Sequence, residues 1–301
     1  MTDSINALTA LSHQTADLVE HAARCVVAVH AGGRRGASGI HWRPGIIVTA
    51  EEALGEDSDI KLTLPGGAEV TASLAGRDPT TDVAVLRFQP DGLAVAETAD
   101  AASLRAGHLV VTVGNHQGAP LASFGMVALA GGPWQSQRGG AIDNLVRLDL
   151  ALNPAAEGGA LVNADGRVVG MAVLGPRRRV LAIPAATIDR VVDQLLAKGH
   201  VFRGYLGAGL QPVWLSDRSA EASAGGRGVL VVSVDPQGPA ARAGVLVGDI
   251  VTAWDAKRIN RVREVIGLLG SDSVGRTVEL GLLRGGAPLA LKIVIGERAV
   301  A

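Results

Sequence analysis

Short apolar runs, separated by turns rich in Gly, Pro and Asp, form the main pattern between residues 26 and 184. Runs of this length that are rich in Val, Ile and Leu and end at such turns predict β-strands. The first six runs are the number expected of one six-stranded barrel, and a second series follows a polar link over Asp91–Ser103. The first series is Val26–His30, Gly39–Trp42, Ile46–Thr49, Ile60–Leu64, Val70–Ala75 and Val83–Phe88; the second is Leu109–Val113, Phe124–Ala130, Leu145–Leu148, Gly159–Asn163, Val168–Leu174 and Val180–Pro184.

Two other segments carry apolar residues at helical spacing. Residues from about Ser4 to Ala23 show a loose helical pattern, and Asp3 or Ser4 is a candidate N-cap. Ala185–Lys198 has a stronger pattern and is followed by Gly199, a residue typical of helix ends. The sequence therefore predicts one helix before the strands and one after them.

The pattern changes from about Phe202, where glycine-bounded apolar strands alternate with a helical segment over Val262–Leu269. We therefore expect three parts: a helical segment over residues 1–23, a domain over 24–200 and a smaller domain over 201–301.

Composition supports a mostly β protein with an aliphatic core. Of 301 residues, 48% are hydrophobic but only 3% aromatic, and forty glycines with thirteen prolines imply many tight turns. The net charge of −1 argues against a nucleic-acid binder with a broad basic surface. Cys25 is the only cysteine, so no intramolecular disulfide can form. We expect no zinc cluster and no cofactor.

The first residues contain no basic segment followed by an apolar one, which a secretory signal would require. No stretch approaches the roughly 18 consecutive apolar residues of a membrane span. This pattern predicts a cytoplasmic protein. A periplasmic location is expected only of a chain from which an export signal has been removed.

Several motifs in the first large domain resemble those of the HtrA/Deg (DegP-like) family of trypsin-like serine proteases. Ser38-Gly39-Ile40 and Gly45–Leu54 resemble the strand and loop that carry the family's general-base histidine. Asp78–Leu86 is similar to the family's D-P-x-T-D-L-A-V-L, and Asn153–Leu161 to its nucleophile loop N-P-G-N-S-G-G-A-L. The resemblance covers about Leu18–Lys198 and implies a chymotrypsin-like double β-barrel.

The same resemblance implies that the catalytic triad is incomplete. It puts Glu52 at the histidine position, Asp82 at the aspartate position and Glu157 at the serine position. Ala155 and Ala156 replace the Gly and Asn of the loop that stabilises the oxyanion. Acyl transfer needs a hydroxyl, an imidazole and an orienting carboxylate, and losing the nucleophile costs about 10⁶ in rate. We therefore expect a pseudoprotease.

Three interpretations of the acidic trio remain open. Glu52, Asp82 and Glu157 form a solvated former active site, or a site for a hard cation with Glu51 as a further ligand, or a cluster paired with local arginines. Like charges about 4 Å apart repel by roughly 4 kcal/mol at an effective dielectric constant near 20. At least one pKa in the trio should therefore be raised.

The last part resembles an HtrA-type PDZ domain, an α+β domain that binds the C-terminus of a peptide along a sheet edge. The resemblance puts the carboxylate-binding loop at Tyr205-Leu206-Gly207 and the peptide-pairing strand at about Ala208–Leu210. The same resemblance places four residues around the pocket for the last side chain of the ligand: Leu206, Val265, Ile266 and Leu269.

The sequence thus predicts an inactive HtrA-like homologue that binds C-terminal or extended peptides, or unfolded protein, in protein quality control. Two alternatives stay open: an active endopeptidase or hydrolase that uses an unforeseen site, and a metal-binding sensor at the acidic trio. The family resemblance also implies a homo- or hetero-oligomer, such as a trimer. The N-terminal helix is the segment expected to contact a neighbouring subunit, because its apolar face must be covered.

Overall fold

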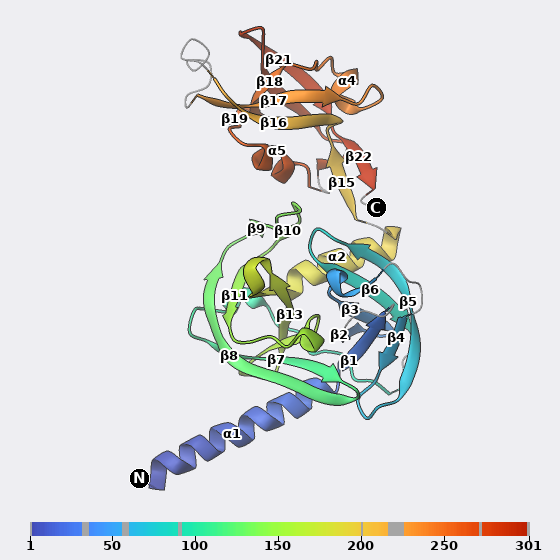
Figure 1. Ribbon diagram of the computed structural model, residues 1–301, viewed down its shortest axis with the longest axis vertical. Helices are drawn as coiled ribbons and strands as arrows, with labels where there is room; N and C mark the ends of the chain where they lie inside the picture. Colours follow the sequence, from blue (N-terminus) through green and yellow to red (C-terminus); the bar gives the residue numbers. More distant parts are fainter. Residues whose placement is uncertain are drawn as a thin grey trace. The chain divides into compact units, whose positions relative to one another are not determined.

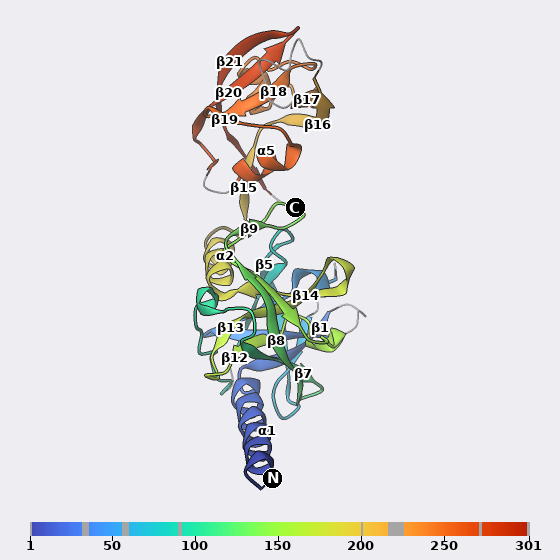
Figure 2. The ribbon, with the colours of Figure 1, turned by 90° about the vertical axis from the view of Figure 1, so that its left-hand side faces the viewer.

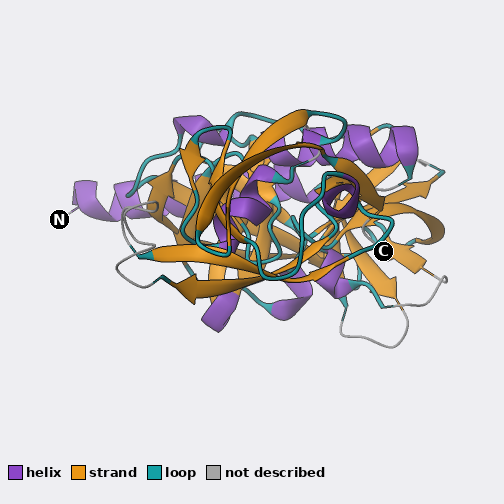
Figure 3. Ribbon diagram, turned by 90° about the horizontal axis from the view of Figure 1, so that it is seen from above, coloured by secondary structure: helices purple, strands orange, loops and turns teal. Residues whose placement is uncertain are grey.

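The computed structural model describes residues 2–31, 36–55, 60–89, 92–199, 201–215, 226–270 and 273–299. The chain divides into two compact units, Met1–His200 and Val201–Ala301 (Figure 1). Strands make up most of the elements of both units, which confirms the mostly β fold predicted from composition and periodicity. Figure 3 shows the strands of the chain in orange.

The first unit contains two closed six-stranded antiparallel barrels, visible side by side in Figure 1. In barrel one the strand order is β1-β2-β3-β6-β5-β4. Its strands are β1 Val26–Ala31, β2 Ala37–Arg43, β3 Ile46–Thr49, β4 Ile60–Thr63, β5 Glu69–Asp78 and β6 Val83–Phe88. Aliphatic side chains fill this barrel, with Ile47, Leu62 and Leu86 fully buried. The predicted strands of this series are confirmed.

Barrel two has the order β11-β14-β13-β12-β7-β8. Its strands are β7 Leu109–His116, β8 Ala119–Gly131, β11 Leu145–Asp149, β12 Ala160–Asn163, β13 Val168–Gly175 and β14 Arg179–Pro184. The hairpin of β7 and β8 is longer than predicted, because Gln117 and Gly118 form a two-residue turn with φ of 54° and 88°. The Asn115 side chain supports this turn by accepting the N–H of Gly118 at 2.8 Å.

A small hairpin of β9 (Trp134–Gln135) and β10 (Ala141–Ile142), which the sequence did not predict, lies between β8 and β11. Helix α1 spans Thr2–Ala23 and projects from the barrels (Figure 2). Helix α2 spans Ala185–Lys198 as predicted, and Gly199 closes it in the left-handed conformation. No helix among the described residues is long and apolar enough to cross a membrane.

The second unit is a six-stranded sheet with the order β16-β17-β18-β20-β21, in which β19 pairs with β18. A separate pair, β15 (Phe202–Tyr205) and β22 (Gly296–Ala299), joins its two ends. The other elements are β16 Ala208–Trp214, β17 Arg227–Val234, α4 Pro239–Arg242, β18 Ile250–Trp254, β19 Lys257–Arg258, α5 Val262–Leu268, β20 Thr277–Arg284 and β21 Ala287–Val294.

Helix α2 is fastened to barrel one by its apolar face and by polar contacts. Leu195 is fully buried, and its side chain lies over Gly76 of β5. The indole N–H of Trp42 donates to Asp189 at 2.8 Å, and Arg43 forms an ion pair with the same carboxylate. The burial of Leu195 contributes more than the exposed ion pair, because exposed pairs contribute little.

We predict that Leu195→Ala lowers the free energy of unfolding of the first unit by about 2–4 kcal/mol, because it leaves a cavity under α2. Leu196→Ala is the matched control, since this neighbour is only half-buried, and it should cost less than about 1.5 kcal/mol. Urea denaturation of both variants measures the difference. Equal losses for the two substitutions would contradict this packing of α2.

Candidate functional site

Asp82 occupies a constrained position at the start of β6. Its backbone is left-handed, with φ of 59°, a conformation that Asp adopts more readily than most residues. Its Oδ1 accepts the backbone N–H of Glu52 at 2.9 Å, and its carbonyl accepts the N–H of Glu51 at 3.4 Å. These bonds fix Asp82 against the short 3₁₀ helix Glu51–Ala53 that follows β3.

Glu157 lies directly after another 3₁₀ turn, Pro154–Ala156, on the loop that leads into β12. Its Oε1 accepts the backbone N–H of Leu174 on β13 at 2.9 Å. Its carbonyl accepts the N–H of Ser38 on β2 at 2.8 Å. Barrel two therefore holds the side chain of Glu157, and barrel one holds its main-chain carbonyl.

Electrostatic coupling joins the three predicted acids. Burial raises the pKa of Asp82 to about 7; the N–H of Glu52 opposes this rise, and the charges of Glu52, Glu157 and Glu51 add to it. Burial also raises the pKa of Glu157, against the N–H of Leu174, and the charge of Glu52 adds to the rise. The structure thus brings Glu52, Asp82 and Glu157 into one acidic cluster at the junction of the barrels.

Two arginines compensate this cluster. Arg138 Nη2 lies 3.1 Å from Oε1 of Glu52, and its Nη1 lies 3.8 Å from Oε2 of Glu51. Arg77 Nη1 lies 3.4 Å from Oε1 of Glu51. Of the three interpretations of the trio, pairing with local arginines therefore describes the outer carboxylates. Within the described ranges, no group of three or more His, Cys, Asp or Glu side chains is arranged to hold a metal ion.

Sequence reasoning missed Arg138, which lies on the loop between β9 and β10. This loop is fastened to the segment before β6: Ser136 Oγ donates to the Thr80 carbonyl at 2.5 Å, and Arg138 Nη1 to that of Pro79 at 3.1 Å. A Cβ on Gly140 would lie 2.3 Å from the Thr80 carbonyl oxygen, so the close approach requires glycine. No local motif indicates such a contact across 56 positions of sequence.

A pocket of about 470 Å³ opens beside the acidic cluster. Glu52, Asp82 and Arg138 line one part of it, and residues of β13, β14 and the β9–β10 loop line the rest. Ser136 is the only serine in this lining, and its hydroxyl is engaged with Thr80. The pocket therefore contains acids and a cation, but no imidazole.

A hydroxyl and an imidazole do meet elsewhere in the first unit. His30 Nε2 on β1 lies 2.9 Å from the hydroxyl oxygen of Thr63 on β4, its neighbour in barrel one. Thr63 is only 5% exposed and does not line the pocket beside Asp82, so a substrate cannot reach this hydroxyl from the pocket. This pair is best explained as a structural contact between β1 and β4.

The backbone donors on both sides of Glu157 are already used within the chain. The N–H groups of five consecutive residues donate to acceptors of the same chain: Ala155 to Asn153 Oδ1 at 2.9 Å, Ala156 to Asn153 O at 2.8 Å, Glu157 to Pro154 O at 3.2 Å, Gly158 to Ala172 O at 2.9 Å and Gly159 to Ala156 O at 3.0 Å. An oxyanion hole needs donors aimed at the reacting oxygen, and the N–H at the nucleophile position is one of them. The resemblance found in the sequence puts Glu157 at that position, and its N–H is already bonded to Pro154.

Barrel one holds this loop in place through Ser38, which is fully buried. Ser38 Oγ donates to the Ala155 carbonyl at 2.7 Å and accepts the N–H of Asn115 at 2.9 Å. Gly158 has φ of +80°, and a Cβ there would lie 2.4 Å from the Ser38 carbonyl oxygen. The loop therefore cannot move without disturbing both barrels.

The second unit presents the loop predicted to bind a carboxylate. Gly207 has φ of +76° and packs against Gly238. Among the described residues, the N–H groups of Leu206 and Gly207 have no hydrogen-bond acceptor, while their carbonyls accept from Ala240 and Asp235 at 2.8 and 2.9 Å. Tyr205 contributes its hydroxyl to Asp235 at 2.9 Å.

The residues predicted to surround the peptide pocket separate into two groups. Leu206 and Val265 are buried in the core of the second unit, so their side chains support the groove from below and do not form an open wall. Leu269 is half-buried against the same core, whereas Ile266 is 42% exposed on α5. Ile266 and the backbone of residues 206–208 are therefore the parts that a ligand can contact.

Comparison with known proteins agrees with both units. Residues 37–171 match the family described as trypsin-like peptidase domain, and residues 204–295 match the PDZ domain family. The chain is 33% identical, over 83% of its own length, to the probable periplasmic serine endoprotease DegP-like of Bartonella henselae, and 31% identical, over 84%, to the periplasmic serine endoprotease DegP of Salmonella typhimurium. It spans 50% and 54% of these two relatives.

A solved structure described as HtrA-type protease AlgW with decapeptide has the same fold. It superposes with a TM-score of 0.77 at 24% identity and covers 95% of this chain and 99% of its own. The expectation of a cytoplasmic protein is wrong, because the relatives named above are periplasmic endoproteases.

We predict that Asp82→Asn removes a pH dependence of stability. Because folding raises the pKa of Asp82 from 3.8 to about 7, the native state holds this proton more tightly than the unfolded chain, and stability falls as pH rises between these values. The variant keeps an acceptor for the Glu52 N–H but cannot ionise. Relative to the wild type it should gain on the order of 2 kcal/mol between pH 5 and pH 8.

Denaturation at several pH values measures this gain. Asp165→Asn, in the exposed turn between β12 and β13, is the matched control and should leave the pH profile unchanged. A profile for Asp82→Asn that parallels the wild type would contradict the assigned burial of this carboxyl.

Proposed function

We propose that this chain, which belongs to the HtrA/Deg family of proteins with a trypsin-like domain and a PDZ domain, binds peptides or unfolded proteins without cleaving them. The assignment to the family rests on both matched domains and on the DegP relatives. We place the chain in the periplasm, the compartment of those relatives, where it would act in protein quality control.

The observation that carries this proposal is the state of the loop at Glu157. A carboxylate occupies the corner where the family has its nucleophile, and its charge opposes an oxyanion. The N–H of Glu157 donates to Pro154, so an oxyanion would also lack this donor. Two requirements of acyl transfer, nucleophile and oxyanion stabilisation, are thus unmet at one residue.

The base is missing as well. The backbone N–H of Glu52 donates to the Asp82 carboxylate, which holds Glu52 as it would hold a triad residue. The side chain of Glu52, however, pairs with Arg138. Glu52 therefore offers no imidazole to take the proton of a nucleophile, which the triad mechanism requires. This pairing supports an inactive scaffold over a new carboxylate-based hydrolase.

The competing function is that of the relatives, which are named serine endoproteases. It would require a nucleophile from outside the usual loop. Ser136 is the serine of the described chain that lies closest to this role, because it lines the same pocket as Asp82. Its hydroxyl already donates to Thr80, and no histidine lines that pocket.

Restoring the triad tests the proposal. We predict no casein cleavage by the unmodified chain and little by the double variant Glu157→Ser, Glu52→His, since its oxyanion donors stay bonded within the loop. Adding Ala155→Gly and Ala156→Asn should raise the rate by about 10²–10³, the value of one oxyanion donor. Ser136→Ala and Glu157→Ala distinguish cleavage by this chain from cleavage by contaminating proteases. Cleavage by the unmodified chain that either substitution abolishes would overturn the proposal.

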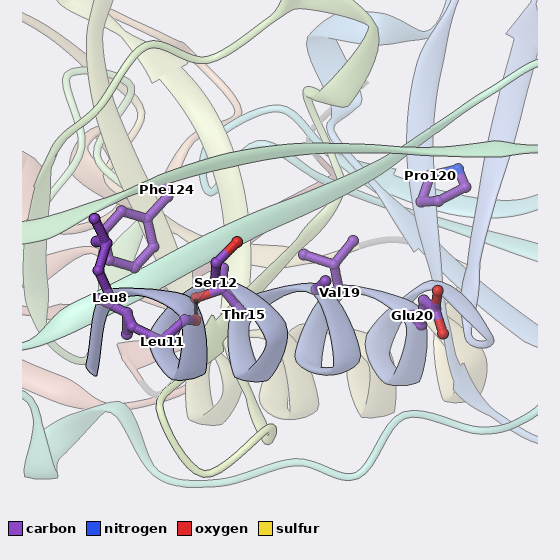
Figure 4. A pocket seen from close by; sticks show the side chains of 9 residues that line it. Leu8, Leu11, Ser12, Thr15, Val19, Glu20, Pro120 and Phe124 are labelled. Atoms are coloured by element: carbon purple, nitrogen blue, oxygen red, sulfur yellow. Dashed lines mark hydrogen bonds between the residues drawn. The ribbon is translucent and has the colours of Figure 1, made fainter. Parts of the chain in front are cut away.

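We also propose that the chain forms a homo-oligomer through α1 and β8. Leu8 is 70% exposed and Phe124 50% exposed, and together with Leu11 and Val19 they line an open apolar groove of about 550 Å³. Figure 4 shows Leu8 of α1 beside the ring of Phe124 on β8. Such a face on an isolated helix favours a covering partner, because exposed apolar patches mark interaction sites.

Analytical ultracentrifugation tests this interface. The double variant Leu8→Glu, Phe124→Glu should sediment as a monomer at concentrations where the wild type is a trimer or another closed oligomer. Val247→Glu is the matched control, since Val247 is 63% exposed in the second unit. An oligomer that survives the double substitution would place the interface elsewhere, and a monomeric wild type would refute self-association.

A further inference from the structure

Strand β16 forms an open edge of the sheet in the second unit. Within the described residues it pairs with β17 on one side only. An open edge is a template for another strand, and a ligand whose carboxylate binds the N–H groups of Leu206 and Gly207 would run antiparallel along β16. The inference below rests on this proposed peptide binding.

Pro212 interrupts that edge. It pairs with Val229 of β17 although it has no N–H to donate, which strands tolerate where the nitrogen faces away from the partner. The missing donor therefore lies on the open side. A ligand can form a regular ladder with the first part of β16, from Ala208 to Gln211, but loses a hydrogen bond at Pro212.

An unusual pair of side chains follows the interruption. Trp214, the last residue of β16, is 74% exposed, and its partner across the ladder is Arg227, the first residue of β17. The guanidinium carbon of Arg227 lies 4.1 Å from the centre of the indole ring, a cation–π distance. In the part of the chain that the structure describes, no carboxylate forms an ion pair with Arg227.

The pair provides two kinds of contact. The indole offers a large exposed apolar surface, over which the guanidinium is stacked. The guanidinium offers donors and a positive charge suited to a carboxylate. Neither contact stabilises the core of the unit, from which Trp214 is absent. An exposed indole with a stacked cation at the end of a binding edge fits a ligand with an acidic side chain.

We propose that Trp214 and Arg227 form a second contact site, which recognises an Asp or Glu side chain of a C-terminal peptide bound along β16. If the ligand's last residue lies opposite Ala208, Trp214 at the end of this seven-residue strand lies opposite the residue six places before it. The distance is about 20 Å at the usual rise of a strand. Pro212 thus separates the backbone hydrogen bonds along residues 208–211 from the side-chain contacts at Trp214.

Peptides of two lengths test the site in the full chain. The probes are fluorescein-labelled peptides that end in Val: a tetrapeptide, and octapeptides with Glu, Gln or Lys at the second position and Ser or Ala elsewhere. In fluorescence polarisation the Glu octapeptide should bind about three- to tenfold more tightly than the tetrapeptide, from one cation contact and one apolar contact. The Gln octapeptide should lose most of this gain, and the Lys octapeptide should lose all of it.

Three variants assign the gain to the named side chains. Trp214→Ala and Arg227→Ala should each reduce the Glu preference while leaving tetrapeptide affinity unchanged, which also shows that they fold. Arg227→Glu should reverse the preference toward the Lys octapeptide. Lys257→Ala, which removes a positive charge at β19, is the matched control and should have no effect.

The outcomes distinguish failure of the proposed peptide binding from failure of the Trp214–Arg227 site. If neither peptide length binds, the proposed peptide binding itself fails. If the tetrapeptide binds and the Glu octapeptide binds no more tightly, or the preference survives Arg227→Glu, the Trp214–Arg227 site is refuted. A preference that follows the charge at residue 227 supports it.

Discussion

The hydrogen bonds that hold the loop from Asn153 to Gly159, within itself and to β13, are the constraint on which the first unit depends. Five consecutive N–H groups are satisfied within the chain, and Ser38 links the loop to barrel one. Buried backbone groups must be paired, so this closed arrangement is stable without a ligand. The same bonds remove the donors that a reacting oxyanion would need. The proposed absence of acyl-transfer chemistry and the stability of this loop therefore have one physical origin.

Glu157 fits this loop because its side chain also finds a donor. The N–H of Leu174 binds its carboxylate, and burial with the neighbouring charge of Glu52 raises its pKa. Asp82, with a pKa of about 7, is the most strongly affected acid of the cluster. Arg138 and Arg77 neutralise Glu51 and Glu52 on the outer side. The acids of this cluster are thus tolerated because each has a donor or a cation.

Most of the fold could be predicted from the sequence, because the apolar runs of strand length correspond to the strands of the two barrels. The segments over Ile46–Thr49 and Val83–Phe88 match β3 and β6 at both ends. The acidic cluster could be placed because motif spacing fixes Glu52, Asp82 and Glu157 on particular loops. Arg138 could not be placed in this way, because its contacts depend on how the loop between β9 and β10 folds over Thr80. Periodicity also did not separate Val265, in the core, from the exposed Ile266 beside it.

A fluorophosphonate labels activated serine hydroxyls, and intact mass spectrometry of the treated native chain shows whether it holds such a hydroxyl. Because the only serine that lines the pocket beside Asp82 is engaged with Thr80 and no imidazole lines that pocket, we predict an unchanged mass. A stoichiometric adduct on any serine of the folded chain, absent after heat denaturation, would contradict it.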